Sequence, residues 1–291
     1  MLWLVSICGL TMSGPACAAP TEAESLLQTY HALEDGLQRS PLKRTALLAS
    51  SESAEHLSGD LHAVVAHSFL NLKAIATSPN RWCEIILLLS NTKACHVNGG
   101  SAINGASAVT TLNVLASSSK SADTSGASTT DFQFVLRRVD PDYLNVELMA
   151  ASGPMGTSDI QLQLQAVQLG ASRTFLKLHY SYTTQWMGRV AMQAYLQTLG
   201  RGKIGFTRQA ESDAWPQYIG GARGVIERNT MRYFLGLDCA LASSGLEPPA
   251  RFNEMASCWY SAVETYPAQL HEMQRTEYLP MKAAEYLRQA P

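Results

Sequence analysis

The middle of the chain reads DFQFVLRRV at residues 131–139, YLNVELMA at 143–150, IQLQLQ at 160–165 and TFLKLHYSY at 174–182. Apolar and polar residues alternate in each run, which is the period of a β-strand with one buried face. Short turn segments separate the runs, so consecutive strands are expected to pair as hairpins. The pattern predicts an antiparallel meander with one apolar face and one glutamine-rich face. Helices must cover the apolar face.

Downstream of the meander the apolar spacing becomes helical. The longest such segment covers residues 222–243 and places Val225, Asn229 and Tyr233 on one side. Further helices are expected at residues 186–199, at residues 249–260 and in a last segment that reaches Arg288, is interrupted at Pro267 and is bent at Pro280.

Upstream of the meander the signals are shorter. Thr21 and Glu24 form a capping box for an amphipathic helix predicted over residues 21–49, which Pro41 interrupts. Ser78 followed by Pro79 is typical of a helix start. The other expected elements are a β-run within residues 59–69, a short helix at 68–76, and a Gly- and Ser-rich loop over 98–130 with one strand at 110–115.

The composition of the chain excludes some classes of function. The chain has 291 residues, of which 46% are hydrophobic, and its net charge is −2. That length and apolar content suffice for a substantial core. A balanced charge argues against a nucleic-acid-binding protein, which needs a basic surface. No stretch after residue 20 approaches the ~20 apolar residues that span a bilayer, so no integral membrane span is expected in the mature chain.

The first residues have the pattern of an export signal. An apolar stretch is followed by Ala16, Cys17 and Ala18, the small-residue pattern of a cleavage site. We therefore expect residues 1–18 to be a signal peptide and the mature protein to be exported, periplasmic or secreted; the alternatives are an uncleaved anchor and a cytoplasmic protein.

Four cysteines remain after that segment: Cys83, Cys95, Cys239 and Cys258. An even number in an oxidising compartment favours two disulfides, for which three connectivities exist. Pairing between sequence neighbours is favoured, which joins Cys83 to Cys95 and Cys239 to Cys258; the alternative is buried thiols.

No decisive catalytic, metal or cofactor motif is present. His271 and Glu272 begin like a zinc-protease motif, but Arg275 stands where the second His is required. We therefore expect no catalytic residue, no metal and no cofactor. Glu227, Arg228 and Arg232 lie at helical spacing, for which a solvated salt bridge is the simplest interpretation and a ligand-carboxylate site the alternative. Glu272 is read as a solvated charge.

The order of elements resembles the helix-grip fold of the START-like (SRPBCC) superfamily. The segments that carry the resemblance are residues 59–69, the SPNRW stretch at 78–82, the meander at 131–182 and the helix at 222–243. NTMRY at 229–233 and LHEM at 270–273 also resemble segments of exported bacterial proteins without an assigned activity.

The resemblance implies an α+β fold in which a curved antiparallel sheet wraps a long C-terminal helix, here with extra helices at both ends. The domain boundaries expected from it are a signal peptide at 1–18, an N-terminal helical segment at 19–57, the START-like domain at 58–245 and a C-terminal helical extension at 246–291 packed on the same domain.

The resemblance also implies binding of a hydrophobic, lipid-like small molecule. Polar residues in the apolar layer are the expected ligand-binding groups, and the protein partner stays unknown. The alternatives are an enzyme of cyclase, hydratase or hydrolase type in the same pocket, which is less favoured, and an envelope interaction module without ligand. His179 and Glu147 could serve an enzyme, but alternation places them away from the apolar layer. The candidate ligand-binding residues are Tyr180, Tyr182, Arg228, Asn229 and Tyr233.

Overall fold

A computed structural model describes most of the chain. The described residues are 20–99, 109–117, 126–184, 190, 192–194, 197–198, 200, 202–209 and 217–289. The signal peptide expected at 1–18 lies outside them, as does most of the helix expected at 186–199.

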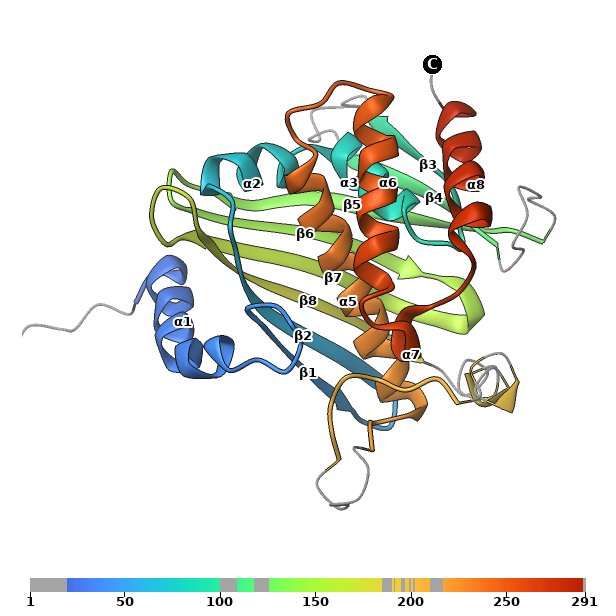
Figure 1. Cartoon of the computed structure of the whole chain (residues 1–291), viewed down its shortest axis with the longest axis horizontal. Coiled ribbons are helices and arrows are strands. Elements are labelled where there is room, and N and C mark those ends of the chain that lie inside the picture. The colour runs from blue at the N-terminus through green and yellow to red at the C-terminus, as the bar shows by residue number, and fades with distance from the viewer. Residues whose placement is uncertain are drawn as a thin grey trace, which may run out of the picture.

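The fold is built on one antiparallel sheet of eight strands in the order β1-β2-β8-β7-β6-β5-β4-β3 (Figure 1). The four strands of the meander are neighbours in this sheet, as their alternation predicted. The strands are β1 (Ala46–Glu52), β2 (His56–Val65), β3 (Thr92–Gly99), β4 (Thr110–Ala116), β5 (Ser128–Val139), β6 (Tyr143–Ser152), β7 (Thr157–Gln168) and β8 (Thr174–Thr184).

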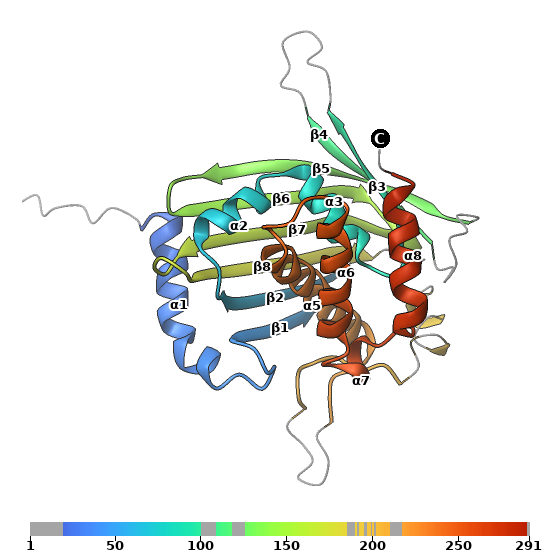
Figure 2. The ribbon, with the colours of Figure 1, turned by 45° about the horizontal axis from the view of Figure 1, so that its top comes forward.

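Helices cover the apolar face of the sheet, and the long helix α5 lies across it (Figures 1 and 2). This arrangement confirms the expected α+β fold. The helical elements are α1 (Glu22–Gln38), α2 (Phe69–Ala76), α3 (Pro79–Leu87), the short 3₁₀ turn η1 (Pro154–Gly156), α5 (Gly221–Ala242), α6 (Ala250–Val263), α7 (Pro267–Leu270) and α8 (Arg275–Leu287).

The two faces of the sheet have different partners. The inner face carries residues such as Leu164 and Leu178, which belong to the main core together with α5. The outer face carries Gln163 and Gln165, and α1 covers it only near Phe175, where a smaller apolar cluster forms. Helix starts follow local rules, since the side chains of Thr21, Ser68 and Ser78 each accept a backbone N–H of the first turn.

Neither edge strand of the sheet was predicted. The helix predicted over residues 21–49 ends at Gln38, and Ala46–Glu52 forms the edge strand β1, which pairs with β2. Pro41 and the following turn break the helix, and the sheet then supplies ladder partners that helical spacing cannot reveal. No element was predicted for Thr92–Gly99, which forms the opposite edge strand, β3.

Two disulfides join the expected neighbours. Cys83 of α3 bonds to Cys95 of β3, with their Cα atoms 5.2 Å apart, and Cys239 of α5 bonds to Cys258 of α6, with a Cα separation of 5.7 Å. Across the described ranges, no helix has the length and apolarity needed to cross a membrane.

Candidate functional site

Three tyrosines meet between β8 and α5. Strand alternation places Tyr180 and Tyr182 on the inner face, and their ring centroids are 5.8 Å apart. Tyr233 of α5 reaches down to Tyr180, with ring centroids 5.3 Å apart and planes tilted by 57°. Such tilted pairs are favourable aromatic contacts. We call Tyr180, Tyr182 and Tyr233 the tyrosine cluster.

The strands next to β8 determine what surrounds the tyrosine cluster. On one side α5 packs closely on β2, and on the other side lie the buried leucines of β7 and β6. Tyr180 pairs with Gly59 on one side and with Leu162 on the other. At Gly59, α5 packs directly on β2. Leu162 pairs in turn with Leu148, and both are buried. The cluster therefore borders the apolar inner surface of β7 and β6.

One side of α5 is only partly buried and runs along this region. Ala222, Val225, Asn229 and Tyr233 are partly exposed, whereas most of their neighbours on the helix are buried. Their spacing of three and four residues places them on one helical face. Asn229 thus shares the face of Tyr233, and its Oδ1 accepts a hydrogen bond of 3.2 Å from Arg232.

The hydroxyl of Tyr182 is unusual because it is buried without a partner. The residue is 3% exposed, and its hydroxyl makes no hydrogen bond with any described group. Burial raises its pKa to about 12, with Glu52 adding to the shift and Arg228 opposing it. Burial also raises the pKa of Tyr233 to about 12 and that of Tyr180 well above its usual range. The cluster therefore presents neutral phenols.

The structure corrects the interpretation of the charged residues on α5. Glu227, Arg228 and Arg232 are all buried, so they form no solvated salt bridge with one another. Arg228 donates to the carbonyl oxygen of Ile204 at 3.2 Å. Arg232 pairs with Glu272 at 2.5 Å, so Glu272 is not the solvated charge expected.

Glu227 holds the segment that precedes α5. Its carboxylate accepts the backbone N–H groups of Phe206 and Thr207 at 2.5 and 3.0 Å and the hydroxyl of Ser50 at 2.6 Å. A buried carboxylate with several donors is satisfied as an anion. Of the five candidate ligand residues, the structure thus groups the three tyrosines, sets Asn229 beside them and commits Arg228 to a backbone carbonyl.

The two residues considered for catalysis lie on the outer face, as alternation indicated. His179 Nδ1 is 3.0 Å from Asp60, and Glu147 pairs with Arg137 at 2.5 Å. Neither is near the tyrosine cluster, because strand alternation places them on the opposite side of the sheet. Among the residues that the structure describes, no group of three or more His, Cys, Asp or Glu side chains could hold a metal ion.

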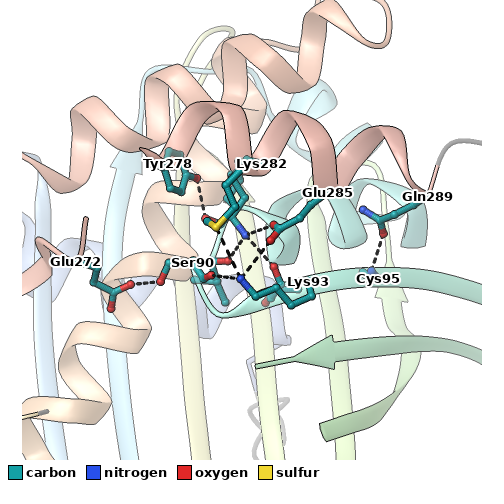
Figure 3. Close-up of polar contacts among 12 residues, drawn as sticks. Ser90, Lys93, Cys95, Glu272, Tyr278, Lys282, Glu285 and Gln289 are labelled. Carbon is teal, nitrogen blue, oxygen red and sulfur yellow. Dashed lines mark hydrogen bonds and ion pairs between the residues drawn. The ribbon is translucent and has the colours of Figure 1, made fainter. Parts of the chain in front are cut away.

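The sequence did not reveal a buried ionic cluster that fastens α8 to β3 (Figure 3). Lys93, Lys282 and Glu285 have fully buried side chains, and Glu285 pairs with both lysines, at 3.2 and 2.7 Å. Lys282 also donates to the carbonyl oxygens of Leu89 and Thr92 at 2.6 and 2.8 Å. Burial lowers the pKa of Lys282 to about 8. The sequence gives no local signal for this cluster, because Lys93 directly follows the polar residues Asn91 and Thr92.

Among the comparisons with known proteins, only the comparison of three-dimensional structures finds similar proteins. No protein-family model matches the chain, and no curated protein matches it. Among solved structures, human StAR-related lipid transfer protein 5 is 10% identical, with 76% of this chain and 99% of the other covered and a TM-score of 0.37.

Two further solved structures have similarly low sequence identities and TM-scores. A norcoclaurine synthase of Thalictrum flavum is 13% identical, covers 51% of this chain and 91% of its own, and has a TM-score of 0.35. A START superfamily protein of Mycobacterium smegmatis is 12% identical, covers 51% and 93%, and has a TM-score of 0.33. Scores at this level carry no argument about function, so the fold rests on the strand order and on α5 held against the inner face. The layout is the helix-grip arrangement expected from the sequence, an antiparallel sheet with α5 held against its inner face. In this helix-grip arrangement the tyrosine cluster lies between the sheet and the gripped helix.

Proposed function

We propose that this chain is an exported binding or carrier protein for a hydrophobic small molecule, held at the tyrosine cluster between β8 and α5. The observation that carries the proposal is the Tyr182 hydroxyl, which is buried without a hydrogen-bond partner among the described residues. A buried polar group without a partner costs about 1–3 kcal/mol. A ligand acceptor atom, such as a carbonyl or ester oxygen, would recover that free energy.

The surroundings suit a molecule with a large apolar part. Leu148 and Leu162 continue the inner face beside the cluster, and the partly exposed side of α5 adds Val225. A mostly apolar surface with a few placed polar groups is how small apolar ligands are held. Asn229 is the remaining polar group on that side of α5.

The export part of the proposal has separate support. Disulfides persist in oxidising compartments and are rare in the cytosol. Two are present here, one between α3 and β3 and one between α5 and α6. The two disulfides are consistent with the signal peptide expected at residues 1–18.

Native mass spectrometry of the protein from a periplasmic preparation tests the proposal, followed by organic extraction of any bound molecule. We expect a stoichiometric hydrophobic adduct, and uptake from a lipid library by protein stripped of it. Y182F should lower the occupied fraction several-fold, since it removes the donor but keeps the ring. Y30F is the matched control, because Tyr30 lies in the outer-face cluster of α1. A bare mass without uptake would overturn the carrier proposal and favour the interaction module.

A further inference from the structure

Two buried donor atoms at the tyrosine cluster make no hydrogen bond with any described group. One is the hydroxyl of Tyr182, and the other is Nε of Arg232. Both residues are more than nine-tenths buried. Buried polar groups are normally hydrogen-bonded, so two unmade bonds at one site call for a cause. Since a phenol hydroxyl and a guanidinium N–H both donate, a molecule that satisfies them must supply acceptor atoms.

Arg232 lies beside the cluster on α5. It directly precedes Tyr233, and its Nη1 donates at 3.2 Å to Oδ1 of Asn229, on the partly exposed side of the helix. Burial raises the pKa of the Tyr233 phenol to about 12, and the nearby charge of Arg232 opposes that shift. The guanidinium therefore lies close to this phenol, at the α5 end of the cluster.

The other nitrogens of this guanidinium have partners. Nη2 pairs with Glu272 at 2.5 Å, and the second carboxylate oxygen of Glu272 accepts the hydroxyl of Ser90 (Figure 3). Burial alone would raise the pKa of Glu272, but Arg232 and Ser90 lower it, so Glu272 stays ionised and keeps the pair. The carbonyl oxygen of Arg232 accepts the indole N–H of Trp259 at 3.3 Å. Nε is thus the one nitrogen of Arg232 that a ligand can satisfy without breaking a described contact.

The kind and number of the two donors indicate a carboxylate. A guanidinium is always charged, and its hydrogen bonds to ionised oxygens are about twice as strong as neutral ones. Burial raises the pKa of Tyr182 to about 12, so its phenol keeps the proton that it donates. Two donors match the two oxygens of a carboxylate. An ammonium head has no acceptor and would leave both donors unsatisfied.

We propose that the ligand of the tyrosine cluster is a long-chain carboxylic acid, whose ionised head accepts from the Tyr182 hydroxyl and from Arg232 Nε. Its chain is directed to the apolar inner surface, where Leu148 of β6 and Leu162 of β7 are register partners. Val225 continues this surface on the partly exposed side of α5. This inference rests on the function proposed above and names the class of its ligand.

Palmitate, methyl palmitate and hexadecanol are the probes. Each is titrated into the full mature protein, stripped of any co-purified molecule, and the bound fraction is measured by native mass spectrometry. The three probes share one chain length and differ in the head, so differences between their affinities report on the head. We expect palmitate to bind about tenfold more tightly than the ester or the alcohol at neutral pH.

Substitution of each donor tests the two assigned contacts. R232K removes Nε but keeps a cation beside Glu272, and Y182F removes the hydroxyl but keeps the ring. Each should lower palmitate affinity about three- to tenfold and reduce the preference for palmitate over hexadecanol. R251K is the matched control, because Arg251 of α6 pairs with Glu84 of α3 at 2.6 Å. It should leave the affinities for all three probes unchanged.

The outcomes separate this inference from the carrier function. Equal binding of the three probes to wild type would overturn the carboxylate head and leave a carrier of apolar molecules. A preference for palmitate that persists in both Y182F and R232K would overturn the two assigned contacts. No uptake of any probe would overturn this inference and the proposed function together. Thermal melts show whether R232K folds, and if it does not, the wild-type series and Y182F decide.

Discussion

Gly59 of β2 lies directly beneath Thr230 of α5, and a Cβ atom at Gly59 would collide with the Thr230 hydroxyl. Only the absence of a side chain lets the gripped helix rest on the backbone of the strand. Gly59 is also the register partner of Tyr180, so the position of α5 and that of the tyrosine cluster are set together.

We expect G59A to lower the free energy of unfolding by about 1–3 kcal/mol, because the helix must shift or Thr230 must change rotamer. Urea unfolding measures this change. G99A is the control, since a Cβ at Gly99 meets open space, and it should stay within about 0.5 kcal/mol of wild type. Equal stability of the two variants would show that the contact at Gly59 is not restrictive.

Removal of the carboxylate from the ionic cluster should be far more damaging than removal of one cation. E285Q leaves Lys93 and Lys282 buried without an anion, and we expect a loss of about 3–5 kcal/mol. K93M leaves one lysine paired with one glutamate, so its cost should be smaller. Urea unfolding of both variants gives the comparison, and a K93M loss as large as that of E285Q would contradict it.

The same cluster predicts a pH dependence with a defined sign. The pKa of Lys282 is about 8 in the folded chain, against an ordinary value of 10.5, because burial disfavours its charge. Between these pH values the unfolded chain binds the extra proton, so stability should rise with pH. The full effect corresponds to ~3 kcal/mol.

Urea unfolding at about pH 7 and about pH 9.5 checks this sign. Wild type should gain stability relative to K282M as pH rises, since K282M lacks the titrating amine. A parallel response of the two proteins would contradict the assignment.

Asp60, on the outer face of the sheet, predicts a loss of folding stability at acid pH. Burial alone would raise the pKa of Asp60, but the hydrogen bond and charge of His179, with Lys177, lower it to about 2 from 3.8. A folded pKa below the unfolded value gives stability that is present above about pH 4 and is lost as pH falls through about 2. D60N should therefore be less stable than wild type at neutral pH, and the difference should vanish at low pH in thermal melts. A difference that persists at about pH 2 would point to a packing defect instead.

The disulfides make a prediction for both stability and mass. C239S/C258S opens a loop with a sequence separation of 19 residues, and we expect a loss of ~3 kcal/mol. The intact mature protein should be about 4 Da lighter than its fully reduced form, because each bond removes two hydrogens. A mass equal to that of the reduced chain would contradict the expected oxidising compartment.

Alternation between apolar and polar residues made the meander predictable, and with it the shared face of Tyr180 and Tyr182. The edge strand β1 was missed because Ala46 and Leu47 continue the apolar spacing of the preceding helix. Strand β3 was missed because its eight residues pair only with β4 and carry no clear period. Edge strands depend on their neighbours more than on their own sequence.

The burial of charged groups could not be predicted in the same way. Lysine is almost never fully buried, so Lys93 and Lys282 read as surface residues. Their pairing depends on α8 returning to β3, a contact between segments far apart in the chain.

The strand order has a consequence for how the protein is made. Strand β2 pairs with β8, the last strand of the sheet to be synthesised, and the crossover through α2 and α3 carries the chain to the far edge before the meander begins. The N-terminal hairpin must therefore wait for most of the polypeptide before it finds its neighbour. Helix α8, the last element of all, then seals β3. Such non-local pairing makes folding slow, so a newly made chain stays open for longer before the sheet can close.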